Sequence, residues 1–151
     1  MNVVDLYKHT AEFMDKDVTL SGWIRNHRKQ KNFGFIDFQD GTCFKHVQVV
    51  YSQELTENFD EVSKLKNGSA IEVKGKVVQS EAKGQAFEVK AEKVTLLGDA
   101  TDEFPIQPKR HTREFLREQA YLRPRTNLFQ AVFRVRSVAA MAIHTYLQDN
   151  G

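Results

Sequence analysis

The side chains best suited to binding chemistry are two phenylalanines on the polar face of a predicted strand. Residues 33–39 read Phe-Gly-Phe-Ile-Asp-Phe-Gln, and the side chains of a strand alternate between its two faces. Phe33 and Phe35 therefore share a face with Asp37 and Gln39. Because unpaired carboxylates do not enter a core, we expect this face to lie in water. Aromatic rings on a wet face can stack on the bases of single-stranded nucleic acid.

A basic segment, residues 25–31, precedes this strand and is expected to form a turn. Its positively charged residues are Arg25, Arg28, Lys29 and Lys31, and it contains no acidic residue. Positive charge can hold a nucleic-acid backbone while neighbouring rings take its bases. A solvated charged hairpin, with one phenylalanine reaching a neighbouring element, would have the same sequence. This segment alone leaves both interpretations open.

The elements that position these residues are expected to be short strands and one helix. Alternating apolar residues and turn signals predict strands over residues 18–27, 33–39, 44–51, 70–78 and 86–97. Between the third and fourth strands, helical spacing relates Leu55, Phe59, Val62 and Leu65. This order predicts a mainly β fold: a five-stranded OB-fold Greek-key barrel, with the helix between strands three and four plugging one end.

The predicted fold gives a second argument for nucleic-acid binding. An OB barrel binds oligonucleotides on strands two and three and on the loops that join strands one to two and four to five. The phenylalanines, the basic segment, His46, Gln48 and the loop at residues 80–85 all fall in this region. Residue chemistry and fold therefore predict the same function.

The character of the chain changes after residue 98. Residues 1–108 carry 14 Lys/Arg and 17 Asp/Glu, whereas residues 109–151 carry 8 and 3. The change suggests two units that meet near residues 105–109, the second of which faces an anion, although a basic linker in solvent would look the same. We expect a short helix over residues 112–120, capped by Thr112, and then a long amphipathic helix that ends at Asn150.

Composition excludes several other kinds of site. The chain has 151 residues and a single cysteine, Cys43, which excludes an internal disulfide and a cysteine-cluster zinc site. No glycine-rich loop has phosphate-binding spacing, and the histidines are not paired with acids at zinc-ligand spacing. No signal peptide and no apolar run of ~20 residues are present, so we expect a cytoplasmic protein that binds no membrane.

Several runs of sequence resemble a known family. Residues 22–25 (Gly-Trp-Ile-Arg), 35–37 (Phe-Ile-Asp) and 47–49 (Val-Gln-Val) resemble the N-terminal anticodon-binding domain of class IIb aminoacyl-tRNA synthetases. Within that class, residues 84–89, 109–112 and, most specifically, 121–127 (Tyr-Leu-Arg-Pro-Arg-Thr-Asn) are similar to asparaginyl-tRNA synthetases. The resemblance covers essentially the whole chain.

The resemblance implies a division of the chain and a parent activity. Residues 1–97 would be the OB-fold anticodon-binding domain, 98–124 a helical hinge or linker, and 125–151 the motif 1 helix, a truncated start of a class II catalytic domain. The parent would be an asparagine–tRNA ligase, a homodimer that uses ATP and magnesium to join asparagine to its tRNA through an asparaginyl-adenylate. Since motifs 2 and 3 are missing, this fragment should be inactive alone and should bind no cofactor.

By the same resemblance, three residues would contact the anticodon loop. Phe35 matches the aromatic residue that stacks on an anticodon base, Gln48 the glutamine that reads the central uridine, and Arg28 a basic residue that contacts the anticodon strand. A glutamine amide can both donate to and accept from a splayed uracil edge. The remaining candidate RNA-binding residues are Arg25, Lys29, Lys31 and Phe33.

Other interpretations stay open. An aspartyl-tRNA synthetase, including a non-discriminating one that charges both tRNAs, has the same barrel, and the residues that select the amino acid would lie downstream. A stand-alone OB-fold module for single-stranded nucleic acid or tRNA would have no use for the last helix. Gln48 could be an exposed strand amide, Phe33 could pack on the barrel rim, and His46 is expected to be a surface residue.

Overall fold

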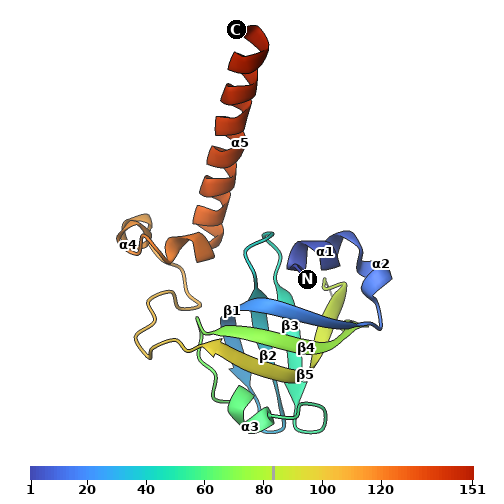
Figure 1. Cartoon of the computed structure of the whole chain (residues 1–151). Helices are drawn as coiled ribbons and strands as arrows, with labels where there is room; N and C mark the ends of the chain where they lie inside the picture. The colour runs from blue at the N-terminus through green and yellow to red at the C-terminus, as the bar shows by residue number, and fades with distance from the viewer. Residues whose placement is uncertain (83) are drawn as a thin grey trace. The chain divides into compact units, whose positions relative to one another are not determined.

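Five strands within the described residues, 1–82 and 84–151, close into a barrel in this computed structural model (Figure 1). The strands are β1 (Asp17–Lys29), β2 (Phe33–Gln39), β3 (Val47–Ser52), β4 (Ala70–Gln79) and β5 (Phe87–Gly98). Around the barrel they follow the order β1-β2-β3-β5-β4; β3 and β5 pair in parallel and the other neighbours are antiparallel. This closed arrangement confirms the predicted OB barrel.

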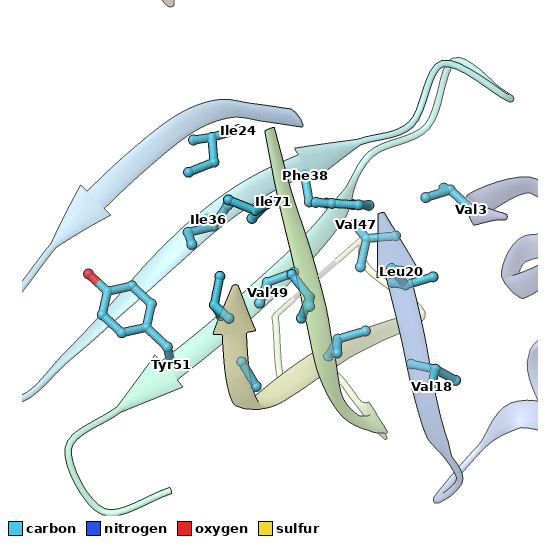
Figure 2. Packing of buried hydrophobic residues seen from close by; sticks show 14 of the residues in the cluster. Val3, Val18, Leu20, Ile24, Ile36, Phe38, Val47, Val49, Tyr51 and Ile71 are labelled. Atoms are coloured by element: carbon cyan, nitrogen blue, oxygen red, sulfur yellow. The ribbon is translucent and has the colours of Figure 1, made fainter. Parts of the chain in front are cut away.

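Alternate residues of the strands form the barrel core (Figure 2). Ile36 and Phe38 of β2 and Val47 and Val49 of β3 have no exposed surface. Burying a side chain of this size contributes about 1.5–3 kcal/mol to folding. Since neighbouring residues of a strand point to opposite faces, the residues that alternate with these four point outwards, as the sequence predicts for Phe35 and Asp37.

The end of β2 differs from the prediction. Gln39 is only 3% exposed and does not share the wet face of Asp37. Gln39 pairs with Trp23 of β1, and the adjacent Gly22 brings β1 so close that a Cβ there would contact the carbonyl oxygen of Gln39. The end of β2 is therefore enclosed, and β1 and β2 approach closely there.

β1 is longer than predicted, which moves the basic residues from a turn onto a strand. Arg25, Arg28 and Lys29 lie on β1, and the turn consists of residues 30–32. Antiparallel pairing with β2 explains the extension, because Arg28 lies opposite Phe35 in the ladder. The turn is therefore shorter than the predicted segment 25–31 and keeps only Lys31 of its four basic residues. β3 begins three residues later than predicted.

The helix between β3 and β4 is present but much shorter than predicted. α3 (Phe59–Val62) has four residues, and Leu55 is 56% exposed instead of plugging the barrel. Before α3, the Thr56 hydroxyl donates to the carbonyl oxygen of Ala91 on β5 at 2.7 Å. This bond ties residue 56 to β5, and the helix starts after it. Val62 still packs in the barrel core.

Two short helices that the sequence analysis missed, α1 (Val3–Lys8) and α2 (Thr10–Phe13), precede β1. Val3 and Leu6 of α1 pack in the barrel core. The carboxylate of Asp40, just after β2, accepts a hydrogen bond from the Val3 backbone N–H at 2.7 Å and fixes the start of α1. Helices of six and four residues are too short to show a clear helical period.

The segment after β5 packs back on the barrel and belongs to the first of two compact units, residues 1–108. Asp102 forms an ion pair with Lys66 at 2.9 Å. The ring of Phe104 lies against Gly68, whose φ of +91° is in the left-handed region and whose missing Cβ leaves room for the ring. The first residues of the predicted 98–124 hinge are therefore bound to the barrel surface.

The second unit, residues 109–151, is helical. It contains α4 (Arg113–Glu118), the 3-10 turn η1 (Arg123–Arg125) and α5 (Asn127–Asn150). As predicted, Thr112 caps the first helix, and its hydroxyl accepts a hydrogen bond from the Phe115 N–H at 3.2 Å. α5 carries exposed apolar side chains along its length, among them Val135 and Val138.

Candidate nucleic-acid interface

The outer face of β1, β2 and β3 brings the predicted residues together in two neighbouring rows. In one row Arg28 of β1 lies opposite Phe35 of β2, which lies opposite Val50 of β3. In the next row Asp37 of β2 lies opposite Gln48 of β3. Side chains opposite each other across a ladder are in contact distance, so a cation, an aromatic ring and an amide share one surface.

Two phenyl rings and a guanidinium form one end of this surface. The ring centroids of Phe33 and Phe35 are 5.5 Å apart with planes at 86°, an edge-to-face contact. The guanidinium carbon of Arg28 lies 5.2 Å from the centroid of Phe35, within the range of a cation–π contact. Phe33 is 40% exposed and Phe35 is half-buried. Unstacked bases of single-stranded RNA bind to surfaces of this kind.

A chain of hydrogen bonds holds the side-chain amide of Gln48. Arg28 donates from Nη2 to Gln48 Oε1 at 3.2 Å, and Gln48 donates from Nε2 to Glu88 Oε2 at 3.3 Å. Ser80 donates from Oγ to the same oxygen of Glu88 at 3.2 Å. An amide has two acceptor and two donor positions, so these bonds leave one of each for a base edge.

A second polar cluster lies beside Gln48. The guanidinium of Arg25 contacts the imidazole of His46, and His46 Nδ1 lies 3.3 Å from a carboxylate oxygen of Asp37. Only 20% of the His46 side chain is exposed, so it is more enclosed than the predicted surface residue. Arg25 is thus directed towards His46, whereas Lys29 and Lys31, at the end of β1 and in the turn, are exposed.

A hollow of about 770 Å³ adjoins this face. Gln48 and Asp37 line one part of it, and Gln85, in the loop between β4 and β5, lines another. The predicted binding loop, residues 80–85, therefore reaches the same site as the strands. Lys83 of that loop lies outside the described residues.

Tyr7 of α1 lines the same hollow. Its hydroxyl donates to the carbonyl oxygen of His46 at 2.6 Å, and the ammonium of Lys45 lies 4.6 Å from its ring centroid. Burial raises the pKa of Tyr7 above its usual value, so the phenol stays neutral and acts as a donor. Tyr7 therefore links α1 to the residues just before β3.

Two other kinds of site were sought along the chain. In the part that the structure describes, no helix has both the length and the apolar character to cross a membrane. Across the same residues, no three His, Cys, Asp or Glu side chains come together as a metal site requires.

Residues 18–97 match the family described as OB-fold nucleic acid binding domain. The chain belongs to this family. The matched stretch contains the β1–β3 face with its rings, cations and amide, so the candidate surface lies within the OB-fold domain itself.

The OB-fold domain and the helices that follow it are similar to asparagine–tRNA ligases. Over 149 residues the chain is 54% identical to the enzyme of Acholeplasma laidlawii and 52% identical to that of Clostridium novyi. Each alignment covers 99% of this chain and 32% of the relative, so the chain spans about a third of the length of these curated relatives. It corresponds to their N-terminal, OB-domain region.

Solved structures show the same correspondence. Asparaginyl-tRNA synthetase from Pyrococcus horikoshii superposes with a TM-score of 0.78 at 26% identity, covering 93% of this chain and 34% of that one. A putative aspartyl-tRNA synthetase from Leishmania major Friedlin superposes with a TM-score of 0.83 over 97% of this chain and 32% of that one. Its identity is 18%, so this second likeness shows the fold alone.

The OB-fold domain has two site residues that the sequence analysis did not single out, Glu88 and Tyr7. Glu88 was placed on the last predicted strand, but its bond to Gln48 depends on the parallel pairing of β3 with β5. Tyr7 belongs to a helix that was not predicted. For Glu88 the available signal is its place on β5 in alternation with the buried Phe87 and Val89.

Proposed function

We propose that this OB-fold domain binds the anticodon loop of asparagine tRNA on the outer face of β1, β2 and β3. Phe35 stacks on an anticodon base, Gln48 binds the edge of the central uridine, and Arg28 contacts the anticodon strand. The observation that carries the proposal is the set of hydrogen bonds that holds Gln48 between Arg28 and Glu88, beside an aromatic ring. Similarity to the N-terminal region of asparagine–tRNA ligases supports it.

The remaining candidates extend this surface. Phe33 adds a second exposed ring next to Phe35. Lys29 and Lys31 are exposed cations at the end of β1 and in the turn, and Lys29 lies opposite Gly34, on the other face of the ladder from the rings. For these two lysines we propose attraction of phosphates that raises affinity without reading sequence. Arg25 contributes to RNA binding indirectly, through the imidazole of His46, which its guanidinium contacts.

We also propose that the chain is part of an asparagine–tRNA ligase, a cytoplasmic homodimer that joins asparagine to its tRNA through an asparaginyl-adenylate. Its regions are then an anticodon-binding domain (1–97), a hinge (98–124) and the first helix of the catalytic domain (125–151). ATP and magnesium bind in the catalytic domain, which the matched third of the relatives does not cover. The described residues contain no acidic cluster that fits magnesium, so no catalytic step is assigned to them.

The two alternatives have less support. The aspartyl-tRNA synthetase likeness rests on the fold alone, at 18% identity. A stand-alone module does not require the sequence after the barrel, yet similarity to asparagine–tRNA ligases extends over 99% of the chain and therefore through α4 and α5.

A change of the central anticodon base tests the proposed function. The affinity of the chain for an asparagine anticodon stem-loop is compared, by fluorescence anisotropy, with that for the same stem-loop carrying cytidine in place of the central uridine. We expect roughly tenfold tighter binding of the uridine form, because the cytidine edge leaves Gln48 mispaired. In Gln48→Ala this preference should disappear. Equal affinity of the wild type for both stem-loops would contradict the proposal.

A further inference from the structure

Lys45, an exposed residue just before β3, lines the same hollow as Gln48 and Arg28. Among the residues that the structure describes, no carboxylate lies within 4.0 Å of its ammonium group. The hollow therefore contains a cation whose charge no ion pair of the described chain neutralises.

The ring of Tyr7 holds this lysine in place. Lys45 Nζ lies 4.6 Å from the ring centroid, within the range of a cation–π contact. The ring is itself fixed on two sides. Its hydroxyl donates to the carbonyl oxygen of His46 at 2.6 Å, and the centroid of the buried Phe87 ring on β5 lies 4.9 Å away. A lysine that is already ordered loses less side-chain entropy when it binds an anion.

The helix that carries Tyr7 is attached to the segment between β2 and β3, from which Lys45 comes. The Val3 N–H donates to a carboxylate oxygen of Asp40 at 2.7 Å, and the Val4 N–H donates to Oγ1 of Thr42 at 3.1 Å. The Thr42 hydroxyl donates to the other oxygen of Asp40 at 2.7 Å. These bonds join α1 to residues 40–42, so that α1 forms a fixed wall of the hollow.

The strand register places Lys45 and Arg28 on different sides of Gln48. Arg28 lies opposite Phe35, and Phe35 lies opposite Val50, two residues after Gln48. Lys45 precedes Gln48 by three residues. In a nucleic-acid strand every internal base has a phosphate on each side, so a strand whose base binds Gln48 carries one phosphate in the direction of Lys45.

We propose that Lys45, positioned by the ring of Tyr7, binds a phosphate of the RNA strand whose base binds Gln48, so that α1 becomes part of the interface. This inference rests on the proposed function. An ammonium group is a compact point charge that suits a phosphate oxygen. Tyr7 is a positioning residue, because its hydroxyl is already bonded to His46. The presence of Gln48 in the same hollow favours RNA over an acidic protein as the partner.

The test compares two variants that each remove one exposed positive charge. Lys45→Gln removes the lysine of the hollow. Lys8→Gln, the matched control, removes the exposed lysine next to Tyr7 in α1, which does not line the hollow. The affinity of each whole chain for an asparagine anticodon stem-loop is measured between about 50 and 200 mM salt. Loss of one phosphate contact in Lys45→Gln should reduce the slope of log affinity against log salt by about 0.7. The control should reduce it by less than half as much.

A double-mutant cycle tests the positioning role of Tyr7. Tyr7→Phe keeps the ring that Lys45 contacts, whereas Tyr7→Leu removes the ring and keeps an apolar side chain against Phe87. Lys45→Gln should weaken stem-loop binding several-fold in the Tyr7→Phe chain, and by less than half that factor in the Tyr7→Leu chain. Equal losses in the two backgrounds would show that Tyr7 does not position the lysine. Thermal melting checks that each variant is folded; Lys45→Gln and Lys8→Gln change only exposed side chains, so the phosphate contact is tested even if Tyr7→Leu does not fold.

The binding data also separate this inference from the proposed function. If Phe35→Ala weakens binding while Lys45→Gln keeps the wild-type slope, the lysine contact is wrong and the proposed function stands. Equal changes of slope in Lys45→Gln and Lys8→Gln would show a general charge effect and would also overturn the contact. If the wild-type chain does not bind the stem-loop, both proposals fail.

Discussion

The imidazole of His27 joins two parts of the barrel wall. Its Nδ1 lies 2.9 Å from the carbonyl oxygen of Leu65, and its Nε2 lies 2.7 Å from the hydroxyl of Tyr51. Both bonds are satisfied by a neutral ring that donates from Nδ1 and accepts at Nε2. Gly34 makes room for this arrangement, because a Cβ there would contact the Tyr51 hydroxyl. Burial lowers the pKa of His27 below its ordinary value of 6.5.

His27 should make the free energy of unfolding decrease in mild acid. The unfolded chain takes up a proton as the pH falls through about 6.5, whereas the folded chain resists protonation, so the contribution of His27 is complete above that pH and is lost below it. Chemical denaturation of the wild type and His27→Gln at about pH 7.5 and about pH 5.5 measures this. The stability advantage of the wild type should shrink at the lower pH, and an advantage that stays constant or grows would contradict the lowered pKa.

Local alternation of residues was enough to predict one part of the candidate surface. It places Phe33, Phe35 and Asp37 on the outward face of β2, and the structure agrees. The same rule misplaced Gln39, which is buried although it alternates with Phe38, because burial at the end of a strand depends on neighbouring elements that alternation does not describe. It also could not reveal that Glu88 holds Gln48, since their hydrogen bond joins two residues that are 40 positions apart in the sequence.

At the scale of elements, strands were predicted better than helices. β2 has the predicted bounds, because turn residues flank a clear alternation of period two. The helical spacing that begins at Leu55 predicted too long a helix, since Thr56 hydrogen-bonds to β5 instead. α1 is held by long-range contacts, such as the bond from its first N–H to Asp40, and these leave no local pattern.

α5 should contribute to association and not to the stability of the barrel. Its apolar side chains are exposed; Val138, for example, is 71% exposed, and a stripe of this kind is larger than monomers usually leave in water. Deleting residues 126–151 should shift the melting temperature of the barrel by less than about 2 °C, equivalent to under ~0.5 kcal/mol. Sedimentation should show less concentration-dependent self-association in the shortened chain.

The outcome that contradicts this prediction is a fall of several degrees in melting temperature that does not depend on protein concentration. In that case α5 would stabilise the barrel directly. The boundary at residues 124–125, which remains a prediction, would then be wrong.

At the scale of the whole molecule, the sequence predicted where the character of the chain changes but not how the connecting segment packs. Along the chain, the boundary between the two compact units falls between Pro108 and Lys109, where the balance of charge also changes sign. The contact of Phe104 with Gly68 was not predictable, because it needs a left-handed glycine 36 residues away in the sequence.

The chain alone should not activate asparagine. It matches about a third of the length of asparagine–tRNA ligases, and the match does not cover their catalytic domain. We therefore expect no exchange of pyrophosphate with ATP, with or without asparagine and tRNA. Asparagine-dependent exchange by the purified chain would contradict this, because the residues that activate asparagine would then lie within these 151 residues.

Substitution of Phe35 tests the central claim, that the outer face of β1, β2 and β3 binds the anticodon loop by stacking. The affinity of Phe35→Ala for an asparagine anticodon stem-loop is compared with that of Lys29→Ala and Lys31→Ala, after circular dichroism has shown that each variant is folded. Loss of a stacking ring should cost ~1–3 kcal/mol, more than the loss of one exposed cation, which mainly alters the salt dependence. We predict the weakest binding for Phe35→Ala; wild-type affinity in the folded Phe35→Ala protein would contradict the claim.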